Sequence, residues 1–176
     1  ADDSGCTALA AVCLNLPGGQ TGKLLVANAG DCQCCLWRGD ELLTVNEEHI
    51  ASNAAERARI EAYGGEVKAT ADGKLRVGGV IQVTRCLGDR KLRKLGLISD
   101  PEMHALDLTS EDKAIVLASD GMWDVLTKAH VLHCLKSTAK SPDMIAKRLI
   151  AEAIEHGTSD NVTVLVVFLR DLSHLV

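Results

Sequence analysis

Three turns in this sequence place an aspartate at the edge of an apolar run. Asp31 ends Asn28-Ala29-Gly30-Asp31, Asp120 lies in Ser119-Asp120-Gly121, and Asp160 lies in Gly157-Thr158-Ser159-Asp160-Asn161. A carboxylate at the end of a buried strand costs free energy unless it is paired or bound to a cation. Carboxylate oxygens favour hard ions such as Mg²⁺ or Mn²⁺. The turns therefore predict an oxygen-ligated metal site if the strand ends converge. The alternative is three ordinary turns, with Asp160 as a local cap.

Composition and charge exclude several classes of protein. Apolar residues make up 47% of the 176 residues, which is typical of a globular chain and, at this length, of a single domain over 1–176. The net charge is -5, and the densest basic stretch, 90–94, is short enough to be a solvated loop. No apolar run reaches the roughly 18 residues of a membrane helix. We therefore expect neither a nucleic-acid partner nor a membrane partner.

The cysteine and histidine residues offer weaker candidate sites. The chain has seven cysteines, an odd number, and we expect buried thiols at Cys6, Cys13, Cys86 and Cys134, as in an intracellular protein of the cytoplasm or nucleus. The one C-x-x-C spacing, at 32–35, lacks the partners of a zinc site. His130 and His133 share a helix face, but no acidic third ligand accompanies them, so they are predicted to be surface or packing residues.

The elements that must position the three acidic turns follow from apolar periodicity and turn residues. Strands are predicted over 7–16, 23–29, 33–37, 41–45, 113–118 and 161–169, with a hairpin turn at 38–40. Helices are predicted over 54–63, 128–137 and 142–156, the last with Ser141 as N-cap and Pro142 at the first position. Residues 65–100 are predicted to form short strands and a mobile excursion. This order indicates an α+β fold in which helices cover antiparallel sheets.

An ordered set of motifs carries a family resemblance. The runs ANAGDC (27–32), ERARIEAYGG (56–65), QVTRCLGD (82–89), ISDPEM (98–103), LASDGMWDVL (117–126) and GTSDNVTVLVV (157–167) resemble the metal-dependent serine/threonine phosphatases of type 2C. The resemblance implies an antiparallel β-sandwich flanked by helices in four αββα layers. It covers the C-terminal two-thirds of the family domain and leaves its N-terminal part missing. The excursion at 65–100 corresponds to the family's flap.

The resemblance also implies site residues and an activity. Asp120 and Asp160 would be ligands of one metal ion, and Asp31 would help to hold a weaker third ion beside a pair of Mg²⁺ or Mn²⁺ ions. The implied reaction is hydrolysis of phosphoserine and phosphothreonine in proteins by a metal-activated water, so the expected partner is a phosphoprotein. Two metal ions can supply such a nucleophile at neutral pH. The implied reaction needs no covalent enzyme intermediate, so no role is expected for the cysteines.

The sequence departs from the family pattern in one important respect. The family's Asp-Gly-His motif and phosphate-binding arginine have no counterpart here, so no catalytic residue is assignable in this chain. The chain starts at Ala1 without an initiator Met, and we expect it to be a piece of a longer enzyme. The alternative is an inactive pseudophosphatase that serves as a binding or scaffold module. His49 receives no role, Arg85 and Arg90 are expected to be solvated charges, and the oligomeric state is left open.

Overall fold

The computed structural model describes residues 3–14, 22–139 and 141–172. The chain forms two compact units. One contains residues 1–10, 27–31 and 47–103, and the other contains 11–26, 32–46 and 104–176. Each unit is assembled from segments that are far apart in the sequence.

The second unit is built on a four-stranded antiparallel sheet in the order β11-β10-β4-β5. Its strands are β4 (Gln33–Arg38), β5 (Glu41–Thr44), β10 (Asp112–Ala118) and β11 (Val164–Phe168). The β4–β5 hairpin closes through Gly39, whose φ of 54° is in the left-handed region that a two-residue turn requires. Cys34 and Cys35 on β4 point to opposite faces of the sheet and are both fully buried, so both faces are covered at this strand.

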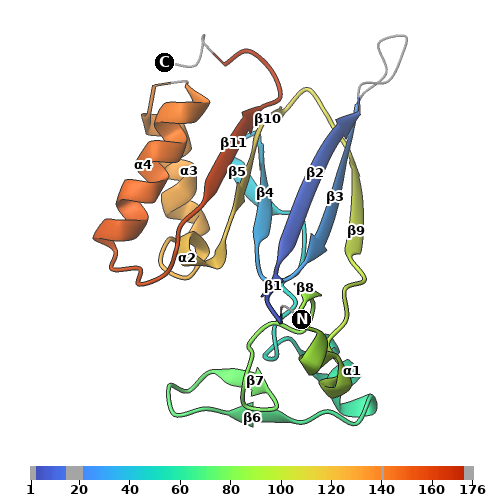
Figure 1. Ribbon diagram of the computed structural model, residues 1–176. Coiled ribbons are helices and arrows are strands. Elements are labelled where there is room, and N and C mark those ends of the chain that lie inside the picture. The colour runs from blue at the N-terminus through green and yellow to red at the C-terminus, as the bar shows by residue number, and fades with distance from the viewer. Residues whose placement is uncertain (1–2, 15–21, 140, 173–176) are drawn as a thin grey trace. The chain divides into compact units, whose positions relative to one another are not determined.

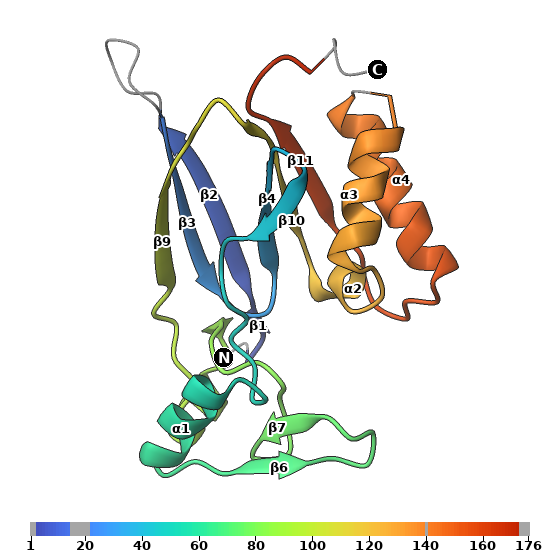
Figure 2. The same ribbon diagram turned by 180° about the vertical axis from the view of Figure 1, so that it is seen from behind.

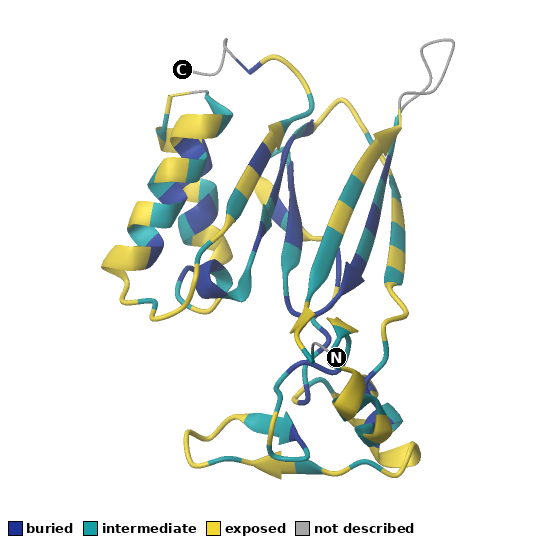
Figure 3. Cartoon of the chain, in the orientation of Figure 1, coloured by how far each residue is buried: buried dark blue, intermediate teal, exposed yellow. Residues whose placement is uncertain are grey.

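Three helices of this unit pack on one face of the sheet. They are α2 (Asp120–Trp123), α3 (Lys128–Ser137) and α4 (Pro142–Glu155), and α3 and α4 lie side by side along the sheet (Figures 1 and 2). Alternate strand residues and the inner helix residues form one apolar cluster; its largest members include Trp37, Met122, Leu135, Ile145 and Leu149. Figure 3 shows buried residues alternating with exposed ones along both long helices. This periodicity is typical of helices that cover a sheet.

The first unit has a smaller core. It contains α1 (Ala54–Ala62), the strand pairs β1 (Gly5–Cys6) with β8 (Leu87–Gly88) and β6 (Val67–Ala69) with β7 (Leu75–Val77), and the 3₁₀ helix η2 (Arg90–Leu95). Its buried apolar side chains are Ala51, Ile60, Val77, Val83, Cys86 and Leu97. A further three-stranded sheet has the order β2-β3-β9, from β2 (Ala8–Leu14), β3 (Lys23–Ala29) and β9 (Glu102–Asp107), and its residues are divided between the units.

The predicted α+β class with antiparallel sheets is confirmed, and most predicted elements are present within one to three residues of their expected ends. The strands and helices at 23–29 and 128–137 have the predicted bounds, and Ser141 caps α4 by accepting a hydrogen bond from Met144 N. The end of the strand predicted over 7–16 lies outside the described residues, as does the Pro17-Gly18-Gly19 turn.

Some predictions were wrong. The basic stretch at 90–94 is not a loop but belongs to η2, because left-handed backbone at Asp89 and Gly96 delimits one short helical segment there. Cys6 and Cys13 are exposed, whereas Cys86 and Cys134 are buried as expected. An apolar sequence around a strand cysteine does not determine which face of the strand is covered.

In the described part of the chain, no helix is long and apolar enough to cross a bilayer.

Candidate metal-binding turns

The Asp120 turn is built at the end of the buried strand β10. Ser119 follows the strand in an extended conformation, and Asp120 begins the short helix α2. Asp120 Oδ1 accepts a hydrogen bond from Gly121 N at 2.9 Å. The carboxylate is therefore held at a helix start and only partly buried.

Ser119 joins this turn to the turn that carries Asp160. Its Oγ donates to Asn161 O at 3.2 Å and accepts from Thr163 N at 3.1 Å. Its backbone N–H also donates to Thr163 O at 3.1 Å, which continues the β10–β11 ladder by one step. One serine thus fixes the two aspartate-bearing turns against each other.

Gly121 allows the two turns to touch. A Cβ added at this position would lie 2.4 Å from Asn161 O and 3.4 Å from the Asp160 Cβ. Any larger residue would therefore push the backbone of the Asp160 turn away. The Asp160 side chain is exposed, and its Oδ1 accepts from Asn161 N at 2.7 Å.

The third predicted ligand, Asp31, belongs to the other unit and is 8% exposed. It follows Gly30, whose φ is 141° and whose added Cβ would lie 2.3 Å from Thr7 side-chain atoms. Only glycine fits this position, since both the backbone angle and the space exclude a side chain. The tight turn fixes the backbone immediately before the Asp31 carboxylate.

His49 holds the backbone of the Asp31 turn. Its Nδ1 accepts from Gly30 N at 3.2 Å, and its own backbone N–H donates to Gly30 O at 2.9 Å. Since Nδ1 accepts, the ring proton is on Nε2, which lies 3.2 Å from Glu102 Oε2. Burial lowers the pKa of His49, and the positive charge of Arg85 lowers it further. No role was expected for this histidine from the sequence, whereas in the structure its ring holds the backbone of the Asp31 turn.

Arg85 is not the solvated charge expected from the sequence. Its guanidinium lies 2.7 Å from Glu56 Oε1, and its side chain is 18% exposed. Burial alone would raise the pKa of Glu56, but hydrogen bonds from Arg85, Arg59 and Thr84 outweigh it and hold this pKa well below its usual range. This ion-pair network supports α1, and Arg85 is engaged within it. Arg90 is exposed, as expected.

The structure thus brings the turns of Asp120 and Asp160 together. Asp31 lies in the other unit, where Gly30 and His49 shape its turn. Sequence patterns identified these aspartates but missed Ser119 and His49, whose partners are distant in the chain. The Ser-Asp-Gly order would have suggested a helix cap at Ser119. Its side chain makes no cap hydrogen bond and instead bonds to Asn161 and Thr163, which no local pattern indicates.

The donor chemistry of the two joined turns fits a hard divalent cation. Both offer carboxylate oxygens, and both carboxylates reach solvent. Gly121 makes this close approach possible, since the space that its side chain would fill is taken by the Asn161 carbonyl. Mg²⁺ keeps several of its waters, so carboxylates that reach solvent suit it better than an enclosed cage.

Comparisons with known proteins agree on one family. The family model described as Protein phosphatase 2C matches residues 1–162. A Saccharomyces cerevisiae relative named protein phosphatase 2C homolog 1 is 38% identical over 180 residues, which cover 95% of this chain and 61% of the relative.

Two further matches cover nearly all of the chain. A rice protein (Oryza sativa subsp. japonica) named protein kinase and PP2C-like domain-containing protein is 44% identical over 170 residues, which are 96% of this chain and 25% of that protein. A solved structure of a C. elegans sex determining protein superposes with a TM-score of 0.84 at 28% identity, covering 95% of this chain and 41% of that one. The chain therefore spans less than two thirds of the length of these relatives.

Proposed function

The chain belongs to the protein phosphatase 2C family, and on that basis we propose that it contributes to metal-dependent hydrolysis of phosphoserine and phosphothreonine in intracellular proteins. The observation that carries the proposal is the Ser119 link, because it holds the Asp120 and Asp160 turns side by side. A protein that used this fold only as a scaffold would have no need to keep costly carboxylates at both of the joined turns.

Asp120 and Asp160 are the proposed ligands of one Mg²⁺ or Mn²⁺ ion, and Asp31 is the proposed ligand of a weaker ion. When bound, such ions supply charge neutralisation for the phosphoryl group and an activated water. The residues of this chain orient the carboxylates: Gly121 N and Asn161 N each hold one carboxylate oxygen, and Ser119 fixes the turns. The hydrogen bond from Gly30 N to His49 Nδ1 holds the backbone next to Asp31 in the same way.

The test compares Asp120→Asn with Asp107→Asn in the full-length protein that contains this chain. Asp107 is a matched control because its side chain is 70% exposed and pairs only on the surface with Lys23. Mn²⁺ affinity is measured by calorimetric titration, and turnover is measured on a phosphothreonine peptide with Mn²⁺ or with EDTA. We expect Asp120→Asn to lose both affinity and turnover, and Asp107→Asn to keep both.

Three other results would contradict the ligand assignment or the proposed activity. Equal Mn²⁺ affinity in the two variants would contradict the ligand assignment. Metal binding without turnover in the unmodified full-length protein would favour the pseudophosphatase alternative. The 176 residues alone should turn over p-nitrophenyl phosphate negligibly, because they lack an Asp-Gly-His motif; robust turnover would mean that the site is built differently.

A further inference from the structure

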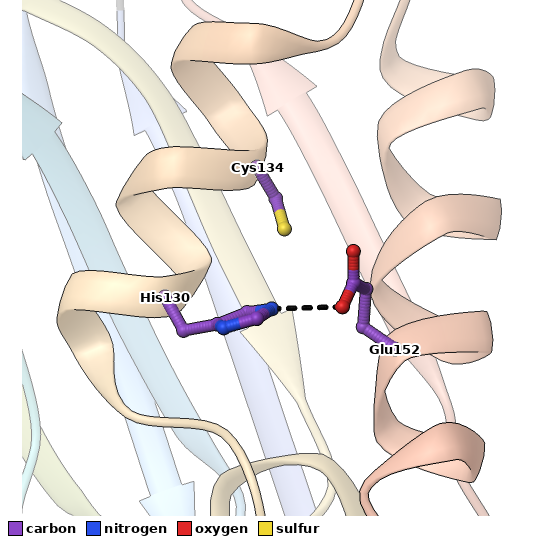
Figure 4. Close-up of side chains that lie close together, drawn as sticks. All are labelled: His130, Cys134 and Glu152. Carbon is purple, nitrogen blue, oxygen red and sulfur yellow. Dashed lines mark hydrogen bonds and ion pairs between the residues drawn. The ribbon is translucent and has the colours of Figure 1, made fainter.

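A second group of metal-ligating side chains lies between α3 and α4. His130 and Cys134 come from α3 and Glu152 comes from α4, and one ligand atom from each lies within 4.8 Å of the other two. Figure 4 shows the thiol and the carboxylate pointing toward the space beside the imidazole ring. His130 Nε2 is 3.0 Å from Glu152 Oε2.

Helical spacing explains how these groups meet. His130 and Cys134 are four residues apart, so both project from the same face of α3. Glu152 of α4 has the same spacing to His156, the C-cap residue of that helix. The His156 ring lies edge-on to the His130 ring, with 4.9 Å between centroids. Each helix therefore presents an i, i+4 pair to the other.

The hydrogen bonds around the cluster leave His156 in a ligand-ready tautomer. Its Nδ1 lies 2.8 Å from Glu152 O, and a carbonyl can only accept, so Nδ1 carries the proton. The neutral ring then has its lone pair on Nε2. Arg148 Nε donates to Glu152 Oε1 at 3.3 Å, which orients the carboxylate from outside the cluster. Such outer contacts are typical of metal sites.

We propose that His130, Cys134 and Glu152 bind a borderline-soft divalent cation such as Zn²⁺ between α3 and α4, with the His156 ring next to that of His130. Tetrahedral zinc places its ligand atoms roughly 3.4–3.7 Å apart, so shifts of about 1 Å would bring the His130, Cys134 and Glu152 ligand atoms, now within 4.8 Å of one another, into range. Binding releases the Cys134 thiol proton to solvent. His130 Nε2, which donates to Glu152 in the metal-free protein, also loses its proton to solvent while Nδ1 of the neutral ring carries one, so two metal bonds replace the His130–Glu152 hydrogen bond.

The burial of the group agrees with this assignment. Cys134 is fully buried, while the His130 and Glu152 side chains are 31% and 21% exposed, which gives an ion a path from solvent. The sequence-based expectation for His130 was a surface or packing residue without an acidic partner, and Glu152 supplies that partner. His133 is exposed, as expected. The thiol makes this donor set different from that of the acidic turns, since Mg²⁺ does not favour sulfur.

The experiment titrates the protein with Co²⁺, a spectroscopic substitute for Zn²⁺, in a large excess of Mg²⁺ that occupies oxygen-ligand sites. We expect a thiolate-to-cobalt charge-transfer band at one equivalent, which Zn²⁺ then abolishes by displacement. His130→Gln and Cys134→Ser should each weaken Zn²⁺ affinity by at least roughly 100-fold, because losing a ligand costs more than losing an outer contact.

Matched controls identify the source of the band. His133→Gln changes the exposed histidine of the same helix, and Cys13→Ser removes an exposed thiol. Both should retain the band, as should Asp120→Asn. A band that disappears in Cys13→Ser but survives in Cys134→Ser would overturn the proposal. So would Zn²⁺ affinity that is unchanged in His130→Gln, because the cluster would then be only an interhelical ion pair.

Discussion

Replacing Gly121 with alanine tests whether close contact between the two acidic turns matters. The added Cβ would lie 2.4 Å from the Asn161 carbonyl oxygen, and Cβ atoms in proteins essentially never approach an atom within 3.0 Å. Both groups are attached to backbone, so no side-chain rotation relieves the clash. One of the turns must move by at least about 0.6 Å.

The size of this displacement sets the expected losses of stability and of turnover in Gly121→Ala. Overpacking of a well-ordered contact costs about 1–3 kcal/mol of stability. A shift approaching 1 Å in a catalytic group costs up to about 100-fold in rate. We therefore expect Gly121→Ala to lower Mn²⁺-dependent turnover by roughly 10- to 100-fold in the full-length protein.

The control must lose stability without disturbing the turns. Gly64 has a φ of 95° and nothing within 4 Å of an added Cβ, so Gly64→Ala carries backbone strain of about 1–2 kcal/mol and no clash. Urea denaturation gives the stability of both variants. p-Nitrophenyl phosphate turnover and calorimetric Mn²⁺ titration give the state of the site.

The reasoning would be refuted by either of two results. The first is a Gly121→Ala variant that keeps both wild-type stability and Mn²⁺ affinity, which would mean that the turns are not in contact. The second is an equal loss of turnover in Gly121→Ala and Gly64→Ala, which would mean that general destabilisation explains the effect.

Three further predictions concern stability and are measured by urea denaturation. As pH falls below about 6.5, unfolded His49 gains a proton that the folded ring resists, so stability should fall by up to about 1.4 kcal/mol per pH unit. His49→Gln should lose this part of the slope, and an unchanged slope would contradict a neutral buried ring. Glu56→Gln should cost about 3 kcal/mol, because Arg85 loses its buried counter-charge; a near-zero effect would show that the pair is dispensable. Ser141→Ala should cost about 1 kcal/mol through the lost cap of α4, whereas Ser141→Thr should remain near wild type.

Local signals in the sequence were sufficient for most elements of the fold. The strand at 23–29 and the helix at 128–137 have their predicted bounds, because apolar periodicity and nearby turn residues determine both. The hairpin at 38–40 was predictable from Gly39, which meets the backbone demand of the turn. Acids at strand ends also singled out Asp120 and Asp160, whose turns the structure joins, while their role as metal ligands stays a prediction.

Other features depend on tertiary contacts that no local pattern encodes. β9 was missed because an apolar side chain lies on its exposed face and an acidic one on its covered face. Met103 is 63% exposed, whereas Glu102 is partly buried beside His49. The helix α2 has only four residues, too few to show periodicity. The His130–Glu152 pair joins residues that are 22 positions apart on two helices, so only the packing of those helices reveals it.

The buried pair of adjacent cysteines on β4 has a consequence for chemical labelling. Burial raises the pKa of Cys34 to about 12 and that of Cys35 to about 11. Alkylating reagents attack the thiolate, and at neutral pH both groups stay protonated and buried. Cys35 belongs to the apolar cluster between the sheet and the helices, so its labelling has to wait for that layer to open, whereas exposed Cys6 is accessible in the native state. The labelling rate of Cys35 thus reports how often the helices separate from the sheet.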